Sequence, residues 1–282
     1  MGQSRHVSDD ISAHRARPEQ RLFRQPGPGQ KETDVLRTFE RGAHRLSVAA
    51  GTRVGMRYPA NFDVLHVDST LPLVAVADGM GGGQGSAVAG STAMATFVDA
   101  VRAAGEDAGA PQLRDAVARA QHRVHAAGAE LGELTGCTLT ALLVDPSGTA
   151  GWITQIGDSR AYRLRGGLLE LLTVDHTAAW LGAVYNWYPA DSPTAAAARY
   201  QLTRYMGHPD LPEPDLLNVS LRPGDVYCLC TDGVSEPISY DRLRQLLDGD
   251  PADAVRIALA DTLAAGGRDN ATMTVVRVES IR

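Results

Sequence analysis

Five aspartates lie in five separate short motifs, each where a strand-like run meets glycine or another turn residue. They are Asp63, Asp78, Asp158, Asp232 and Asp269. A carboxylate at the end of a strand is held by the sheet while its oxygens face an open cleft. Several converging carboxylates repel one another unless a cation neutralises them. Because hard divalent cations prefer oxygen ligands, the five motifs predict a site for Mg²⁺ or Mn²⁺.

Each motif taken alone also has a simpler interpretation. Aspartate followed by glycine or asparagine, as in Asp78-Gly79 and Asp269-Asn270, is typical of tight turns and helix caps. For a single motif the turn interpretation is the better one. All five motifs in this order, each beside a strand-like run, favour a shared metal site instead.

The composition bounds the class of protein. The 282 residues are 44% hydrophobic and 21% charged, which is typical of a soluble globular protein. No apolar stretch approaches the roughly 18 residues that span a bilayer, and the polar N-terminus lacks the apolar core of a signal peptide. We therefore expect a cytoplasmic protein with no membrane partner. Residues 1–45 carry a net charge of +3 and the remainder −9, and such an acidic body argues against nucleic acid as a partner.

The three cysteines and a pair of histidines are interpreted as structural. Cys228 and Cys230 alternate on one apparent strand, and neighbours on one strand face rarely meet disulfide geometry. No second Cys/His pair lies at a spacing suited to zinc. His122 and His125 fall three apart on an expected helix, but the arginine and alanine around them indicate a solvated face.

The first 45 residues are expected to form a flexible N-terminal tail, and residues 46–282 a single folded domain. The tail shows no sustained periodicity and contains a proline- and glycine-rich stretch at 25–30. Apolar residues near its end predict a short helix over 34–44. The tail could serve as a docking or regulatory arm or be a solvated leader, and its composition favours the leader.

From residue 47 onward, strands and helices come in blocks. Apolar periodicity separates the two types of element. The expected strands cover 62–67, 71–76, 138–144, 150–156, 161–164, 168–172, 218–219, 226–230 and 272–278, and the expected helices cover 86–104, 112–131, 240–247 and 252–265. The order is hairpins, a helix pair, hairpins again, a second helix pair and a last strand. This order favours antiparallel sheets covered by helices over a parallel sheet.

Residues 178–216 fit this scheme least well. The segment is rich in proline and in aromatic side chains such as Trp180, Tyr185 and Trp187. A long irregular insertion between strands is usually functional or mobile. Its aromatics could line a substrate groove or form a small satellite core, and the sequence supports both equally.

Together and in order, the motifs resemble those of bacterial metal-dependent protein phosphatases of the protein phosphatase 2C (PPM) family, from about residue 47 to residue 278. The matching motifs are Asp-Gly-Met-Gly-Gly at 78–82, Gly-Asp-Ser-Arg-Ala-Tyr-Arg at 157–163, Leu-Thr-Val-Asp-His-Thr at 172–177, Thr-Asp-Gly-Val at 231–234 and Arg-Asp-Asn-Ala-Thr at 268–272. The resemblance implies an α+β fold, a four-layer α-β-β-α sandwich of two antiparallel sheets flanked by helix pairs. It also implies that residues 46–282 are the catalytic domain.

The resemblance assigns metal-binding roles motif by motif. Asp78 would bridge two Mn²⁺ or Mg²⁺ ions, and the carbonyl of Gly79 would bind one of them. Asp232 and Asp269 would hold the other ion. Asp158 resembles the ligand of a third, weaker metal, shared with Asp232. The implied cofactor is therefore two ions, with room for a third.

Residues 55–63 depart from the family's first motif, Gly-x-x-Arg-x-x-Asn-Glu-Asp. Tyr58 occupies the arginine slot and Phe62 the glutamate slot. The family's arginine meets the substrate phosphate, so Arg57, one residue away, is the candidate for that contact here. In an extended segment, however, a one-residue shift points a side chain the other way. The last aspartate of the motif, Asp63, is retained and would support the cluster mainly through water.

The chemistry of such a centre is direct hydrolysis. Two cations that share a water lower its pKa far below that of bulk water, and the resulting hydroxide attacks a phosphate ester in line. Together with this chemistry, the resemblance implies a Ser/Thr protein phosphatase that acts on phosphorylated proteins, opposite kinases in bacterial signalling. Two alternatives stay open: a catalytically weak pseudophosphatase that binds phosphoproteins or other partners, which Tyr58 and Phe62 favour, and a small-molecule phosphohydrolase on the same centre.

Overall fold

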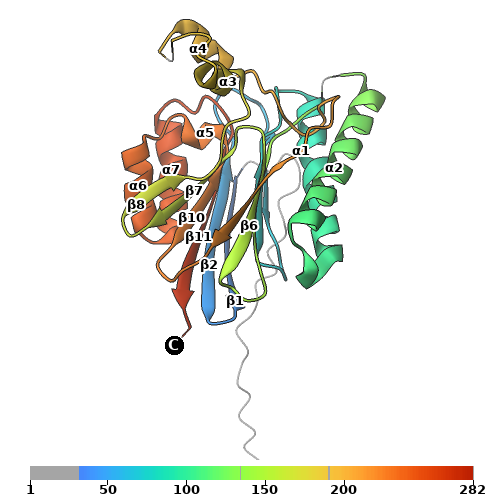
Figure 1. Cartoon of the computed structure of the whole chain (residues 1–282). Helices are drawn as coiled ribbons and strands as arrows, with labels where there is room; N and C mark the ends of the chain where they lie inside the picture. The colour runs from blue at the N-terminus through green and yellow to red at the C-terminus, as the bar shows by residue number, and fades with distance from the viewer. Residues whose placement is uncertain (1–31, 134, 190, 282) are drawn as a thin grey trace, which may run out of the picture.

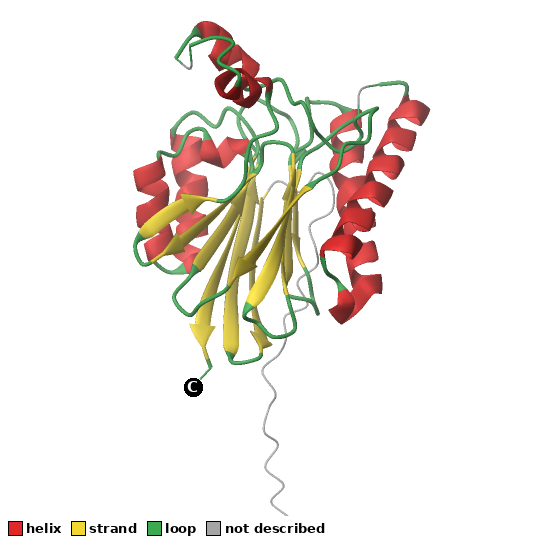
Figure 2. Ribbon diagram, in the orientation of Figure 1, coloured by secondary structure: helices red, strands yellow, loops and turns green. Residues whose placement is uncertain are grey.

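The computed structural model describes residues 32–133, 135–189 and 191–281. Two antiparallel sheets lie face to face, and helices cover both outer faces (Figure 1; Figure 2). One sheet has the strand order β1-β2-β11-β10-β7-β8 and the other β3-β4-β5-β6-β9. The predicted α+β class and the four-layer arrangement are confirmed.

The strands and helices have the following bounds. The first sheet contains β1 (Glu32–Arg41), β2 (His44–Arg53), β7 (Arg160–Arg165), β8 (Leu168–Leu171), β10 (Val226–Cys230) and β11 (Ala271–Ser280), and the second contains β3 (Val64–Val67), β4 (Leu73–Ala77), β5 (Leu139–Val144), β6 (Ala150–Ile156) and β9 (Asp215–Ser220). The helices are α1 (Gln84–Ala104), α2 (Ala110–Leu131), α3 (Ala178–Val184), α4 (Pro193–Ala198), α5 (Asp232–Ser235), α6 (Tyr240–Asp248) and α7 (Pro251–Ala264), with a 3-10 turn at Gly105–Asp107.

Three apolar layers hold the sandwich together. Side chains such as Leu142 and Tyr227 fill the space between the two sheets. Phe97 of α1 belongs to the layer beneath α1 and α2, and Leu247 of α6 to the layer beneath α6 and α7. Burying such side chains is the main favourable contribution to folding. The layers fix the strand ends relative to one another, and the strand ends carry the predicted site.

The N-terminal part of the domain corrects two predictions. The helix expected over 34–44 is wrong, because Glu32–Arg41 forms strand β1 and pairs along its whole length with β2. Val35 and Phe39 face the core while Leu36 is 57% exposed, which is the period of a strand. The folded domain therefore includes residues 32–45, which were expected to belong to the tail. The rest of that tail, for which a docking arm was one of the two interpretations, lies outside the described residues.

The insertion at 178–216 contains two short helices, α3 and α4, which lie beyond one end of the sheets (Figure 1). Part of it forms the satellite core that the sequence allowed: Ala195 and Ala198 are buried, and the ring of Tyr188 lies against Gly182. Trp180 remains about half exposed. No helix among the described residues has the length and apolar character to cross a membrane.

Candidate active site

Two of the predicted aspartates flank one hairpin. Asp63 immediately precedes β3 and Asp78 immediately follows β4. These strands pair antiparallel, with Val64 opposite Ala77. The start of one strand and the end of the other therefore lie side by side, and the two carboxylates share one edge of the second sheet.

Two more aspartates occupy the matching position in the first sheet. Asp232 follows β10 and begins α5, and Asp269 lies just before β11. Cys230 and Met273 are paired in this antiparallel ladder. Asp158, the fifth, lies in the turn that connects β6 of one sheet to β7 of the other. The sandwich thus brings all five predicted residues to one edge.

The charges of the other four predicted aspartates all act on Asp78, which indicates that the carboxylates converge around it. Burial, followed by the charges of the other four, raises the pKa of Asp78 well above its usual range. Burial is also the main cause that raises the pKa of Asp63 to about 7, of Asp158 to about 8 and of Asp232 to about 6. Burial raises the pKa of Asp269 as well. Such shifts mark carboxylates that lack a neutralising partner.

Some buried carboxylate oxygens of the cluster lack a hydrogen-bond partner, and a bound cation would supply one. Asp63 Oδ2 accepts hydrogen bonds from the hydroxyls of Thr231 (2.9 Å) and Thr272 (2.6 Å). Its other oxygen, Oδ1, and Oδ1 of Asp232 are buried without a partner in the described part of the chain. Because buried polar atoms are nearly always paired, the donor set fits divalent cations. In this structure, no group of three or more acidic, histidine or cysteine side chains among the described residues is arranged so that it could hold a metal ion.

Hydroxyl and imidazole groups that sequence reasoning did not single out hold the aspartates in place. The backbone N–H of Asp78 donates to Thr138 Oγ1 (2.9 Å), which shares a hydrogen bond with Ser159 Oγ (2.7 Å). The Gly157 N–H donates to Nδ1 of His176 (3.1 Å). The end of β4 and the turn between β6 and β7 are therefore linked. Ser159 and His176 lie within the family-like motifs, whereas Thr138 lies in none of them.

Two glycines beside the aspartates leave no space for a side chain. A Cβ at Gly79 would lie 2.7 Å from the carbonyl oxygen of Ser86 and 2.8 Å from that of Phe62. At Gly233 it would lie 1.8 Å from the carbonyl oxygen of Asn270. The backbone after Asp78 and Asp232 is therefore packed closely against neighbouring carbonyl groups, which requires glycine at both positions.

The altered first motif places aromatic rings and one arginine at the margin of the cluster. The guanidinium carbon of Arg57 lies 5.1 Å from the ring centroid of Tyr58, and the rings of Tyr58 and Phe62 meet edge to face at 5.8 Å. Arg57 is exposed, and its charge counters the rise in the pKa of Asp269. Its guanidinium forms no ion pair with any described residue. Arg57 is thus near the cluster and free to accept an anion.

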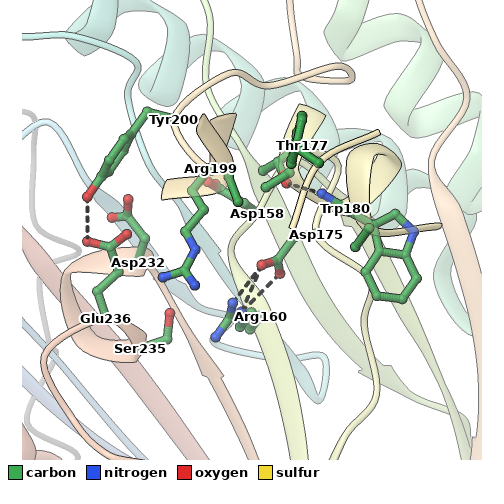
Figure 3. A pocket seen from close by; sticks show the side chains of 14 residues that line it. Asp158, Arg160, Asp175, Thr177, Trp180, Arg199, Tyr200, Asp232, Ser235 and Glu236 are labelled. Atoms are coloured by element: carbon green, nitrogen blue, oxygen red, sulfur yellow. Dashed lines mark hydrogen bonds and ion pairs between the residues drawn. The ribbon is translucent and has the colours of Figure 1, made fainter. Parts of the chain in front are cut away.

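A pocket of about 590 Å³ adjoins the aspartates and is partly walled by the insertion (Figure 3). Trp180 and Tyr188 contribute to the wall, so part of the insertion lines a groove in addition to its satellite core. Tyr185 and Trp187 instead stack on each other, at 5.6 Å, away from the pocket lining. The other polar lining residues are Asp158, Arg160, Asp175, Thr177, Arg199, Tyr200, Asp232, Ser235 and Glu236.

The chain is similar to known proteins over most of its length. A family model described as protein phosphatase 2C matches residues 61–265. The serine/threonine protein phosphatase PstP of Mycobacterium tuberculosis is 31% identical over 239 residues, which are 83% of this chain and 45% of the relative. The chain thus spans less than half the length of that relative. The serine/threonine phosphatase stp of Listeria monocytogenes is 24% identical over 77% of this chain and 88% of its own.

Solved structures show the same likeness. The crystal structure of the Mycobacterium tuberculosis phosphatase PstP/Ppp has a TM-score of 0.73 and 30% identity, covering 83% of this chain and 99% of its own. A structure of the PstP catalytic domain in complex with two manganese ions has a TM-score of 0.70 and 30% identity, covering 84% of this chain and 100% of its own.

Proposed function

Because the chain belongs to the protein phosphatase 2C family, we propose that it hydrolyses phosphoserine and phosphothreonine on proteins with the help of Mn²⁺ or Mg²⁺. The observation that carries the proposal is the cluster of five converging aspartates. Two buried oxygens in it, Asp63 Oδ1 and Asp232 Oδ1, lack a partner among the described residues. Carboxylates in this state repel one another and gain most from a divalent cation.

The proposed ion-binding groups follow the positions of the motifs. The residues that would hold two ions are Asp78, Asp232 and Asp269 with the carbonyl of Gly79, while Asp158 would hold a third, weaker ion and Asp63 would support the set mainly through water. When bound, the ions supply an activated water and neutralise phosphoryl oxygens. The hydroxyls of Thr231 and Thr272 keep Asp63 oriented toward the cluster.

Arg57 and Cys137 both lie near the cluster, and only Arg57 takes part in the proposed reaction. Arg57 binds the substrate phosphate, because a guanidinium pairs strongly with phosphate oxygens. Burial, and to a lesser extent the nearby charge of Asp78, raises the pKa of the Cys137 thiol far above neutrality. Cys137 therefore stays protonated at neutral pH. A thiol is a poor nucleophile. This supports attack by water rather than through a covalent intermediate on cysteine.

The names of the relatives support a proposal for the substrate class and the cellular setting. The relatives are named as serine/threonine phosphatases, which supports phosphorylated proteins as partners, and we propose a cytoplasmic role in bacterial signalling opposite protein kinases. Neither the relatives nor the retained aspartates give support to the pseudophosphatase alternative. Tyr58 and Phe62 change the margin of the cluster but leave the five carboxylates in place.

The test is hydrolysis of p-nitrophenyl phosphate and of a phosphothreonine peptide by the full chain, stripped of metal and then supplied with Mn²⁺ or Mg²⁺. We expect turnover only with the cation. Asp78→Asn should be inactive, whereas Asp241→Asn, a change at an exposed aspartate of α6, should behave as wild type. Full turnover by stripped protein in excess EDTA would refute the metal mechanism.

A further inference from the structure

We propose that the pocket between the aspartate cluster and the insertion is a specificity site for an acidic side chain of the substrate, and that Arg199 binds this side chain. The inference rests on the proposed phosphatase function and deepens it. It names a preference among phosphoproteins, namely for substrates with glutamate or aspartate close to the phosphorylated residue.

Two arginines line the pocket, and a carboxylate of the described chain holds only one of them. Asp175 holds the guanidinium of Arg160 through hydrogen bonds of 2.6, 2.9 and 3.2 Å. Arg199, at the C-terminal end of α4, is exposed and points into the pocket (Figure 3). Its guanidinium forms no hydrogen bond or ion pair with any described residue. Arg199 is therefore the cation in this pocket that remains free for a ligand.

Three of the four carboxylates that line the pocket are engaged by other cations once ions are bound. Asp158 and Asp232 belong to the proposed ion-binding set, and Asp175 is taken by Arg160. Glu236 accepts a hydrogen bond from the hydroxyl of Tyr200 (3.4 Å). A free guanidinium in a partly enclosed site is well suited to a carboxylate, because it offers two parallel N–H donors.

The size and position of the pocket favour a neighbouring side chain over the scissile phosphate itself. A volume of about 590 Å³ lies in the range of pockets that take whole ligands. Arg57 is associated with Asp269, and neither residue lines this pocket. Trp180 and Tyr188 give the pocket an apolar wall. The Tyr188 hydroxyl, which donates to the carbonyl oxygen of Ala178 (2.8 Å), fixes part of that wall in place.

The experiment compares phosphothreonine peptides that differ only in whether glutamate, alanine or lysine occupies the positions next to the phosphothreonine. With the full chain in Mn²⁺, we expect the glutamate peptide to have the lowest KM. Arg199→Ala should raise that KM about tenfold with little change in kcat, as for loss of a charge-assisted hydrogen bond. It should leave the alanine peptide and p-nitrophenyl phosphate nearly unchanged. Arg199→Glu should reverse the preference toward lysine.

Matched controls separate this role from others. Arg123→Glu makes the same charge change at an exposed position of α2 and should not alter the preference. Glu236→Gln tests whether Arg199 acts only through the contact between Tyr200 and Glu236, and it should leave the preference for glutamate in place. An Arg199→Ala protein that loses activity toward p-nitrophenyl phosphate as much as toward peptides would overturn the inference, because Arg199 would then contact the scissile phosphate.

A binding measurement distinguishes failure of this inference from failure of the proposed function. Calorimetric titration with the dephosphorylated peptides needs no turnover. We expect the glutamate peptide to bind wild type more tightly than the lysine peptide and expect Arg199→Ala to remove that difference. Equal affinities in wild type would overturn the specificity site even if the phosphatase is active. A clear difference in a protein without turnover would support the site and count against the proposed function alone.

Discussion

Strands β3 and β10 are each flanked by an aspartate at both ends. The carboxylates at one end of the sandwich receive donors from the chain, whereas those at the other end keep oxygens without a partner among the described residues. At the end away from the proposed site, Asp68 follows β3 and Asp225 precedes β10. At the site end, Asp63 precedes β3 and Asp232 follows β10. All four lie beside the same two strands, so they differ mainly in the hydrogen-bond donors and charges around each carboxylate.

Asp68 is fully buried and fully supplied with donors. Its oxygens accept hydrogen bonds from His66, from the backbone N–H groups of Thr70 and Leu71, and from Nε of Arg102 at 2.8 Å. Burial opposes its ionisation, but these hydrogen bonds and the charge of Arg102 outweigh burial and hold the pKa of Asp68 well below its usual range. The carboxylate needs nothing from outside the chain.

Asp225 is satisfied in the same manner. Two nitrogens of Arg165 donate to its two oxygens, each at 2.7 Å, and the backbone N–H of Arg222 donates at 2.8 Å. Asp63 and Asp232 have no arginine of this kind and each keep one buried oxygen without a described partner. Burial alone therefore does not mark a metal ligand. A buried carboxylate oxygen that receives no hydrogen bond from the described residues is the better indicator.

The largest effect that this comparison predicts is on activity. Asp78→Asn and Asp232→Asn should reduce turnover to background, because each removes a charge needed to hold the ions. Without metal, the same variants should be at least as stable as wild type, because a repelling charge is removed from a buried cluster. Thermal unfolding in EDTA and in Mn²⁺ checks this: the Mn²⁺-induced rise in Tm should be lost. A drop in Tm in EDTA would contradict it.

The pH dependence of stability should also separate the two ends. In EDTA, Asp63, Asp158 and Asp232 hold protons up to about pH 6–8 in the folded state, whereas in the unfolded chain aspartate titrates near pH ~3.9. The folded state then binds more protons, so the free energy of unfolding falls as pH rises through this window. Asp68 has a lowered pKa, so its contribution is present above about pH 4 and is lost as pH falls further.

Urea unfolding in EDTA across this pH range should therefore show maximal stability on the acid side of neutrality. Mn²⁺ should restore stability mainly above pH ~7, because ions bind the deprotonated carboxylates. If the free energy of unfolding in EDTA instead rises steadily from pH 5 to pH 8, the carboxylates of the cluster do not repel one another in the folded state.

Removing a charge at the end of the sandwich that carries Asp68 and Asp225 should lower stability, the opposite of the effect expected in EDTA at the site end. We expect Asp68→Asn to lower the free energy of unfolding by about 3 kcal/mol, because it leaves buried donors without a charged acceptor. Activity at saturating Mn²⁺ should remain near wild type at temperatures where the variant is folded. Urea unfolding at pH 7 measures the loss, with Asp63→Asn in EDTA as the matched change at the other end of β3. Equal destabilisation by both would remove the distinction between the two ends.

The smallest predicted effect concerns the arginines. Arg102 and Arg165 are committed to carboxylates, whereas Arg57 only lies over the ring of Tyr58. If Arg57 binds the phosphate, Arg57→Ala should raise KM roughly ten- to a hundredfold, equivalent to about 1.5–3 kcal/mol. Tyr58→Phe keeps the ring and should stay near wild type. Unchanged kinetics for Arg57→Ala, together with tighter binding by Tyr58→Arg, would show that Arg57 has no role in phosphate binding.

The sequence by itself determined most of the framework and singled out the carboxylates of the proposed site. Strands β6 and β10 have the predicted bounds, because alternating or continuous apolar runs between turn residues leave little freedom. The five aspartates could be found because each lies beside a strand end within a motif that resembles the phosphatase family. A position beside a strand end is not sufficient by itself, because Asp68 and Asp225 also lie there.

Only the tertiary structure decided the features that depend on distant partners. The spacing of Val35, Leu36 and Phe39 is compatible with a helix, and full-length pairing with β2 makes it a strand. The sequence cannot show which aspartates receive donors, because Arg102 reaches Asp68 from a different element of the fold. Likewise, Arg199 lines a pocket with Asp158 and Asp232 only because the insertion folds back toward the sheet edge. Local patterns fix elements, whereas the pairing of charges depends on how the elements pack.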